Sequence, residues 1–392
     1  MHHRQSRTTL LNLCLVNRFL CQIARPLLYH DAPFDLGSKW NTKEVNAKML
    51  CLKKTLSEEV EFARFVKQVT VSLGNNTEHW ENFFSLLPML VNLKSIVVRD
   101  GASWDEEDEE DWEVSNFCGR LAKEPIVIKS LEFIHRKIDT FSWITLANSL
   151  PHLETLAGAF TLKPLEYYSS PEYDPFDELG WRRNKPNLVP TFHLRCMSFA
   201  YSTTQVIFDQ VLSTSFDSLT SLSLQISHQS KIIHISACRN LRSLYFILSD
   251  EQRVEDWSRR VPALHYSQAV QNLETLLSTT QSLSIRHIEI TSYEEPMSYS
   301  RHSDETLSTL PSSLQSLVVF SQFLIKGRWL SMFPLDGTRP LPQLKHVLLL
   351  PPHDKAFDYI IKNPKDSPSS VCHFIPTCER LGIRCEMNWE EW

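Results

Sequence analysis

The chain has 392 residues, a formal net charge of -6 and a hydrophobic content of 42%. This charge balance gives no general attraction to nucleic acid, whose recognition normally leaves a basic footprint on a protein. Only nine glycines occur, and neither a G-x-x-x-x-G-K nor a G-x-G-x-x-G motif is present. The sequence therefore disfavours a phosphate-cradling loop.

Cysteine usage and hydropathy bear on the compartment. The nine cysteines are scattered from Cys14 to Cys385 without a C-x-x-C pair, which favours reduced thiols in an intracellular protein. The N-terminus lacks a signal-peptide pattern, and no stretch reaches the roughly 18 apolar residues of a membrane span. We expect a cytoplasmic or nuclear monomer that binds neither membrane nor nucleic acid.

Residues 1–35 predict a short helical module. Thr8 or Thr9 can cap a helix, and apolar residues follow at alternating three- and four-residue steps. These residues are Leu13, Val16, Leu20, Ile23 and Leu27. By this pattern alone, the module could be a plain N-terminal cap for the domain that follows. Residues 36–61 predict a connecting helical segment.

The same module resembles a known family. The phrases L-C-L-V-N-R-F (residues 13–19) and A-R-P-L-L-Y-H (residues 24–30) resemble the second half of an F-box, as in large fungal families of F-box proteins. The family's opening L-P-x-E-I segment has no counterpart, so we expect a partial F-box, truncated at its N-terminus. The positions carried over as F-box-like helix residues are Leu10, Leu11, Leu13, Val16, Phe19 and Leu20.

Residues 62–392 repeat one apolar spacing, L-x-x-L-x-L. The clearest copies begin at Leu219 and Leu241, and degenerate copies recur along the segment. The degenerate copies begin at Val66, Leu93, Leu194, Ile285, Leu314 and Leu344. Their intervals scatter around the roughly 20–29 residues of a leucine-rich repeat, and the pattern resembles that superfamily.

This spacing predicts an α/β fold. Alternate residues of a strand point the same way, so Leu222 and Leu224 would face a core while Ser221 and Ser223 face the other side. Stacked units would form a leucine-rich-repeat solenoid, a curved parallel sheet with helices on its convex side. The usual Asn or Cys after the last apolar position is absent, and Ser227 stands there in one copy. We therefore expect an irregular arc, with an ordinary α/β domain as the alternative.

Two insertions interrupt the repeats. Residues 101–117 include seven consecutive carboxylates, Asp105 to Asp111, which repel one another and predict a solvated loop. Docking of a basic partner is the alternative function for this run. Residues 162–190 predict a second loop, and long loops of this kind are often functional.

Alternation also predicts the residues of the concave face. They are Ser221, Ser223, Gln225, Ser243, Tyr245, His287, Glu289, Val318, Phe320 and Leu348. The later positions are apolar. Either a partner inserts there, because exposed apolar patches commonly mark interaction sites, or a returning segment of the chain covers them.

No catalytic, cofactor or metal signature is present. Neither G-x-S-x-G nor H-E-x-x-H occurs, and Cys378 and Cys385 are spaced too widely for a typical zinc pair. The F-box resemblance implies a substrate-recognition subunit of an SCF-type ubiquitin ligase, with a Skp-type adaptor on the F-box and an unknown protein substrate on the concave face. The alternatives are a free-standing leucine-rich-repeat scaffold and an enzyme with an unrecognised site.

Overall fold

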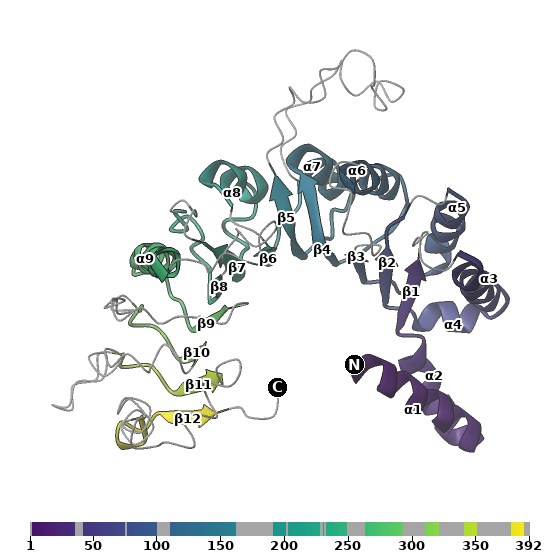
Figure 1. The fold of residues 1–392 in the computed structure, drawn as a ribbon, viewed down its shortest axis with the longest axis horizontal. Helices are drawn as coiled ribbons and strands as arrows, with labels where there is room; N and C mark the ends of the chain where they lie inside the picture. Colours follow the sequence, from purple (N-terminus) through teal and green to yellow (C-terminus); the bar gives the residue numbers. More distant parts are fainter. Residues whose placement is uncertain are drawn as a thin grey trace, which may run out of the picture. The chain divides into compact units, whose positions relative to one another are not determined.

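The computed structural model describes residues 2–35, 42–74, 77–99, 110–161, 191–200, 203–227, 230, 233–248, 263–292, 310–320, 341–350 and 378–387. The chain divides into two compact units, Met1–Leu194 and Arg195–Trp392. Figure 1 shows that strands alternate with helices along unit 1, whereas in unit 2 several described strands follow one another in the chain with no described helix between them.

Unit 1 begins with two helices and continues as alternating strands and helices. Its elements are α1 (His2–Val16), α2 (Arg18–Leu28), β1 (Asp31–Asp35), α3 (Thr42–Glu58), α4 (Val60–Phe65), β2 (Gln68–Ser72), α5 (Thr77–Leu86), the 3-10 helix η1 (Leu87–Met89), β3 (Ser95–Arg99), α6 (Glu110–Leu121), β4 (Ser130–Asp139), α7 (Thr140–Ser149) and β5 (Thr155–Thr161).

The five strands of unit 1 pair in parallel and in chain order. Parallel neighbours require a crossover, and Figure 1 shows α5, α6 and α7 on one side of the strands. Val69, Ile96, Leu131 and Leu156 stand opposite one another in register. Each of these side chains is fully buried. Each of the four strands therefore contributes one residue to an apolar row in the core.

Aromatic side chains fill the space between the helices and strands of unit 1. Phe83 packs against Phe34 of β1 at a ring-centroid distance of 5.3 Å and against Phe117 of α6 at 6.0 Å. Trp80 of α5 lies 5.9 Å from Phe117, and its indole Nε1 donates a 2.6 Å hydrogen bond to the Gly74 carbonyl. The buried indole therefore satisfies its one donor.

The predicted loop at 101–117 is corrected in its second half. Residues 110–117 belong to α6, while residues 100–109 lie outside the described residues. Val114, Phe117 and Leu121 recur at three- and four-residue steps and are all buried. This buried apolar stripe explains why the second half of the predicted loop is helical.

The parallel sheet also begins earlier than the predicted start near residue 62. Strand β1 lies within the segment 1–35 that the sequence predicted to be helical, and it pairs with β2. The short run Asp31–Asp35 contains a proline, which favours a sheet edge. Ala32 and Phe34 alternate inward and are 2% and 1% exposed. The segment 36–61 contains α3, which lies between β1 and β2 in the chain like the later helices.

The described residues of unit 2 include seven strands and the helices α8 and α9. Its elements are β6 (Cys196–Phe199), α8 (Gln205–Leu212), β7 (Ser221–Ile226), β8 (Ser243–Leu248), α9 (Ala263–Ser278), β9 (His287–Ser292), β10 (Ser316–Phe320), β11 (His346–Leu350) and β12 (Arg384–Met387). All the strand pairs are parallel and follow the chain order. The predicted α/β class with parallel strands is therefore confirmed.

The core of unit 2 follows the predicted alternation. Leu222, Leu244, Ile288, Leu317 and Val347 stand opposite one another on successive strands. All five side chains are fully buried. The predicted insertion at 162–190 lies outside the described residues.

Two local features differ from a regular ladder. At the position where the predicted leucine-rich repeat would carry Asn or Cys, Ser227 places its hydroxyl 3.3 Å from the Ser230 hydroxyl, three residues away in the chain. Before β12, Gly382 has a φ of 69°, a conformation that favours glycine. The turn is closed by the Ile383 amide, which donates to the Cys378 carbonyl at 2.8 Å.

Candidate functional site

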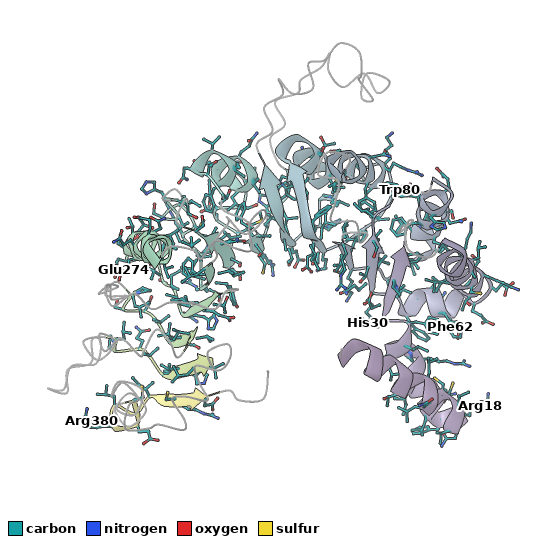
Figure 2. The ribbon with its side chains drawn as sticks, in the orientation of Figure 1. Arg18, His30, Phe62, Trp80, Glu274 and Arg380 are labelled. Carbon is teal, nitrogen blue, oxygen red and sulfur yellow. The ribbon has the colours of Figure 1, made fainter. Side chains whose placement is uncertain are left out.

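The pair α1–α2 is the first candidate surface. Asn17 ends α1 and caps α2, because its backbone is extended and its Oδ1 accepts a 2.8 Å hydrogen bond from the Leu20 amide. A packed contact fixes α2 to the rest of unit 1: Tyr29 stacks on Phe62 of α4 at 4.6 Å, and the Arg25 guanidinium lies 5.4 Å from the same ring. Figure 2 labels Phe62 on α4 and Arg18, the first residue of α2.

Both helices expose large apolar side chains, which we call the helical apolar surface. Its members and exposed fractions are Leu11 (51%), Leu15 (85%), Val16 (67%), Phe19 (67%), Ile23 (52%) and Leu27 (59%). Leu11 and Leu15 are four residues apart on α1, and Phe19, Ile23 and Leu27 repeat that step on α2. Residues four apart share one side of a helix, so each helix carries an apolar stripe. Exposed apolar surface of this kind marks interaction sites.

The charge of this segment has one sign. Residues 2–30 include Arg4, Arg7, Arg18 and Arg25 and contain no aspartate or glutamate. Arg18 and Arg25 are exposed beside the helical apolar surface. An acidic partner with an apolar groove would complement this combination.

The six F-box-like residues divide into two groups. Leu11, Val16 and Phe19 belong to the helical apolar surface, whereas Leu10, Leu13 and Leu20 are half-buried. The carried-over positions did not include Leu15, Ile23 and Leu27. For Ile23 and Leu27, the four-residue step from Phe19 was a visible signal.

The second candidate surface is the side of β7–β12 opposite the buried row, which we call the open face. Its first row runs Ser221, Ser243, His287, Ser316, His346 and Arg384, one residue per strand. Its second row runs Ser223, Tyr245, Glu289, Val318, Leu348 and Glu386. The structure thus aligns the predicted serines with Tyr245, His287 and Glu289, and all of these are half-buried.

Three predicted positions of this face need correction or lie outside what is described. Gln225 and Val318 are each only 8% exposed, so they offer little surface to a partner. Leu348 is half-buried. Phe320 ends β10, and its side chain lies outside the described residues. The apolar end of the predicted face therefore presents less contact area than alternation alone suggested.

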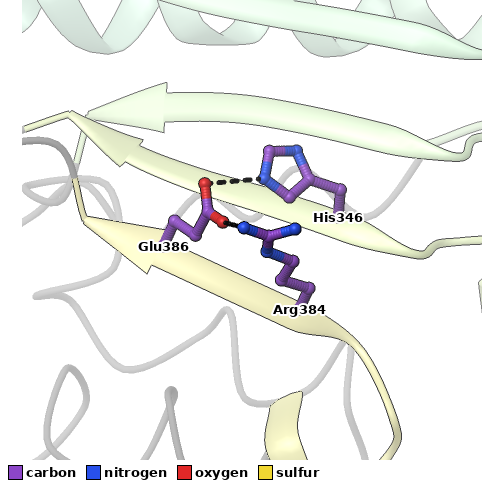
Figure 3. Close-up of polar contacts among 3 residues, drawn as sticks. All are labelled: His346, Arg384 and Glu386. Atoms are coloured by element: carbon purple, nitrogen blue, oxygen red, sulfur yellow. Dashed lines mark hydrogen bonds and ion pairs between the residues drawn. The ribbon is translucent and has the colours of Figure 1, made fainter.

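Ring and polar contacts connect side chains of the open face, both between neighbouring strands and within one strand. The Tyr245 and His287 rings lie 5.4 Å apart, and His287 Nε2 is 3.8 Å from Glu289 Oε2. Figure 3 shows a similar group in which His346 Nε2 lies 3.4 Å from Glu386 Oε2, while Arg384 forms an ion pair with the other carboxylate oxygen. The hydrogen bond from His346 and the charge of Arg384 hold the pKa of Glu386 below its ordinary value, although desolvation opposes them.

The turn before β12 brings Cys378 and Cys385 together. A hydrogen bond to Cys385, with burial, raises the pKa of the Cys378 thiol, and the same hydrogen bond lowers the pKa of Cys385. Within the described ranges, no three His, Cys, Asp or Glu side chains are grouped so that they could hold a metal ion. The helices in those ranges include none long and apolar enough to span a membrane.

Comparisons with known proteins give no family. No protein-family model matches the chain, and no curated protein matches it by sequence. A solved structure of a Bacteroides fragilis protein, determined by a structural genomics consortium, aligns with 89% of this chain and 83% of its own at 9% identity, with a TM-score of 0.35. These values are too low to transfer a fold or a function.

Proposed function

We propose that this chain is a non-catalytic interaction protein, an F-box-like leucine-rich-repeat subunit of an SCF-type ubiquitin ligase. The pair α1–α2 binds a Skp-type adaptor, and the repeats hold a protein substrate. The observation that carries the proposal is the helical apolar surface, whose six side chains are each at least half exposed.

Energetics support a partner at this position. Burying a large apolar side chain is worth about 1.5–3 kcal/mol, so covering even three of the six would supply a substantial part of an association free energy. The Tyr29–Phe62 stack anchors α2, so the surface is presented on a preorganised helix. The F-box resemblance falls on the same two helices, which is why we assign the adaptor to them.

The substrate role rests on the open face. Half-buried Tyr245, His287 and Glu289 come from neighbouring strands and offer aromatic and charged groups side by side. Side chains fixed on a sheet are more rigid than side chains on loops, which lowers the entropy cost of binding.

The alternative function is a free-standing leucine-rich-repeat scaffold without a ubiquitin-ligase link. The same open face supports it. In that case, the helical apolar surface would contact some other protein or another segment of this chain.

Calorimetric titration of the purified chain with a Skp-type adaptor tests the proposal. We expect binding by the wild type and at least tenfold weaker binding by the double variant Phe19→Ser, Ile23→Ser. The matched control is Val60→Ser, Val206→Ser, which removes apolar side chains that are 55% and 63% exposed on other helices. It should bind like the wild type.

Absence of binding by the wild type would leave the scaffold alternative, and equal affinities of the two double variants would place the adaptor contact elsewhere. Because all four side chains are exposed, both variants should retain the wild-type thermal unfolding midpoint, and that measurement accompanies the titration.

A further inference from the structure

A row of basic residues lies at the starts of the strands in unit 1. Each residue immediately precedes a strand, and its amide donates to the carbonyl of the equivalent residue one strand earlier. Lys67 donates to His30 at 3.0 Å, Lys94 to Lys67 at 2.8 Å, and Lys129 to Lys94 at 2.8 Å. Figure 2 labels His30 before β1. These backbone bonds place the lysines on directly adjacent strands.

Unit 2 repeats the arrangement. Arg242 donates to Thr220, Arg286 to Arg242, Gln315 to Arg286 and Lys345 to Gln315, at 2.8–2.9 Å. The row in this unit is Arg195, Thr220, Arg242, Arg286, Gln315 and Lys345. It contains no acidic residue. We call these residues and their counterparts in unit 1 the basic rows.

Most side chains of the basic rows are exposed, whereas Arg242, Gln315 and Glu154 are half-buried, and Arg242 Nη1 donates a 3.2 Å hydrogen bond to the Ser284 carbonyl. Lys67, Lys94, Arg286 and Lys345 are exposed, and among the described residues they form no ion pair. Adjacent parallel strands are about 4.8 Å apart, so charges on neighbouring strands fall well within a Debye length of about 8 Å at physiological salt. Each row therefore concentrates positive charge that an anionic ligand would relieve.

The ion pair between Lys129 and Glu154 shows how a lysine of the unit 1 row binds a carboxylate. Glu154 occupies the row position next to Lys129, and its carboxylate lies 2.6 Å from the Lys129 ammonium. A carboxylate is thus already bound along the direction of the row. Lys67 and Lys94 continue that row across the two preceding strands.

We propose that each basic row, by itself, binds an extended acidic protein segment. An extended chain places a side chain on the same side about every 6.8 Å, and flexible lysine and arginine stems can adjust to that spacing. This inference rests on the proposed function in one respect: it takes the segment to be part of the substrate protein. Binding of the segment itself requires no adaptor.

The surroundings favour a narrow protein segment over a nucleic acid. The chain carries a net charge of -6, and the open face beside the unit 2 row contains Glu289 and Glu386. These carboxylates would repel a broad polyanion. A single extended strand can follow the row without approaching them.

Fluorescence anisotropy with a labelled peptide of alternating Glu and Ser tests the proposal, with the Gln and Ser peptide as the uncharged control. The variants are Lys67→Gln, Lys94→Gln for unit 1 and Arg286→Gln, Lys345→Gln for unit 2. The matched control is Lys54→Gln, Lys123→Gln, which removes the same charge from exposed positions off the rows. We expect each row variant to bind the acidic peptide roughly fivefold more weakly, and the control to bind like the wild type.

Two results would overturn the proposal. In the first, the row variants and the control variant bind the acidic peptide equally. In the second, a single-stranded oligonucleotide of equal charge binds the wild type more tightly than the peptide does. Equal thermal unfolding midpoints of the variants show that folding is unchanged. The peptide measurement uses no adaptor, so its outcome is separate from that of the adaptor titration.

Discussion

The carboxylate of Glu386 on β12 lies 3.4 Å from the imidazole of His346 on β11. β11 and β12 are neighbouring parallel strands. Arg384, two residues earlier on β12, contacts the same carboxylate. These two neighbours favour the ionised form and lower the pKa of Glu386. A charged group on the open face therefore links the last two strands of unit 2.

This arrangement predicts an acid-dependent loss of stability. Because the pKa of Glu386 is lower in the folded state than its ordinary value of 4.5, its stabilising effect is complete above that value and disappears as the pH falls through the folded-state pKa. Thermal unfolding of the wild type and Glu386→Gln should be compared between about pH 5.5 and pH 3. The difference in midpoint should shrink on acidification; a growing difference would contradict the assignment.

The buried row of unit 2 predicts a large packing effect. Leu222 is fully buried, so Leu222→Ala should lower the free energy of unfolding by about 2–5 kcal/mol. The adjacent Ser223 faces the open side, and Ser223→Ala should change it by less than about 0.5 kcal/mol. Urea unfolding followed by circular dichroism measures both. Similar losses at the two positions would mean that the alternation is misassigned.

The cap between the N-terminal helices can be tested separately. Asn17 Oδ1 accepts from the Leu20 amide at 2.8 Å, and Asn17→Ala should cost about 1 kcal/mol of stability. Asn17→Asp keeps an acceptor and should retain most of the stability. If the alanine and aspartate variants unfold at the same midpoint, the side chain does not cap α2.

Thiol reactivity should distinguish two cysteines. Burial, with a smaller effect of Asp209, raises the pKa of Cys238 to about 12, whereas Cys51 on α3 is exposed. Because the thiolate is the reactive form, iodoacetamide at about pH 8 should label Cys51 and spare Cys238 until the chain is unfolded. Peptide mass spectrometry checks this, and rapid labelling of Cys238 in the folded chain would contradict its burial.

The repeated strands could be predicted from the sequence because the same alternation of buried and exposed side chains governs each of them. Leu222 and Leu244 are separated by a variable connection, yet the same two-residue alternation buries both. The sequence did not predict β1 because Asp31–Asp35 is short and contains a proline. Its strand signal was limited to two apolar residues at alternate positions, Ala32 and Phe34. The first part of α6 was predicted as a loop because of the acidic run, although the three-residue step from Val114 to Phe117 is typical of a helix.

The candidate surfaces were harder to foresee. Alternation assigns Val318 to the open face, but exposure depends on what neighbouring side chains cover, and Val318 is 8% exposed. The basic rows lie at a position that the apolar pattern does not constrain. Lys67 and Lys94 become neighbours only when the strand register is known, so a single sequence gives no sign of them.

Deuterium uptake by the chain, alone and with a Skp-type adaptor, would locate the proposed contact between them. We expect slower exchange in peptides covering α1 and α2, around Phe19 and Ile23, with no change in β7–β12. Unchanged exchange across residues 10–28, or protection confined to the strands, would contradict an adaptor bound to the helical apolar surface.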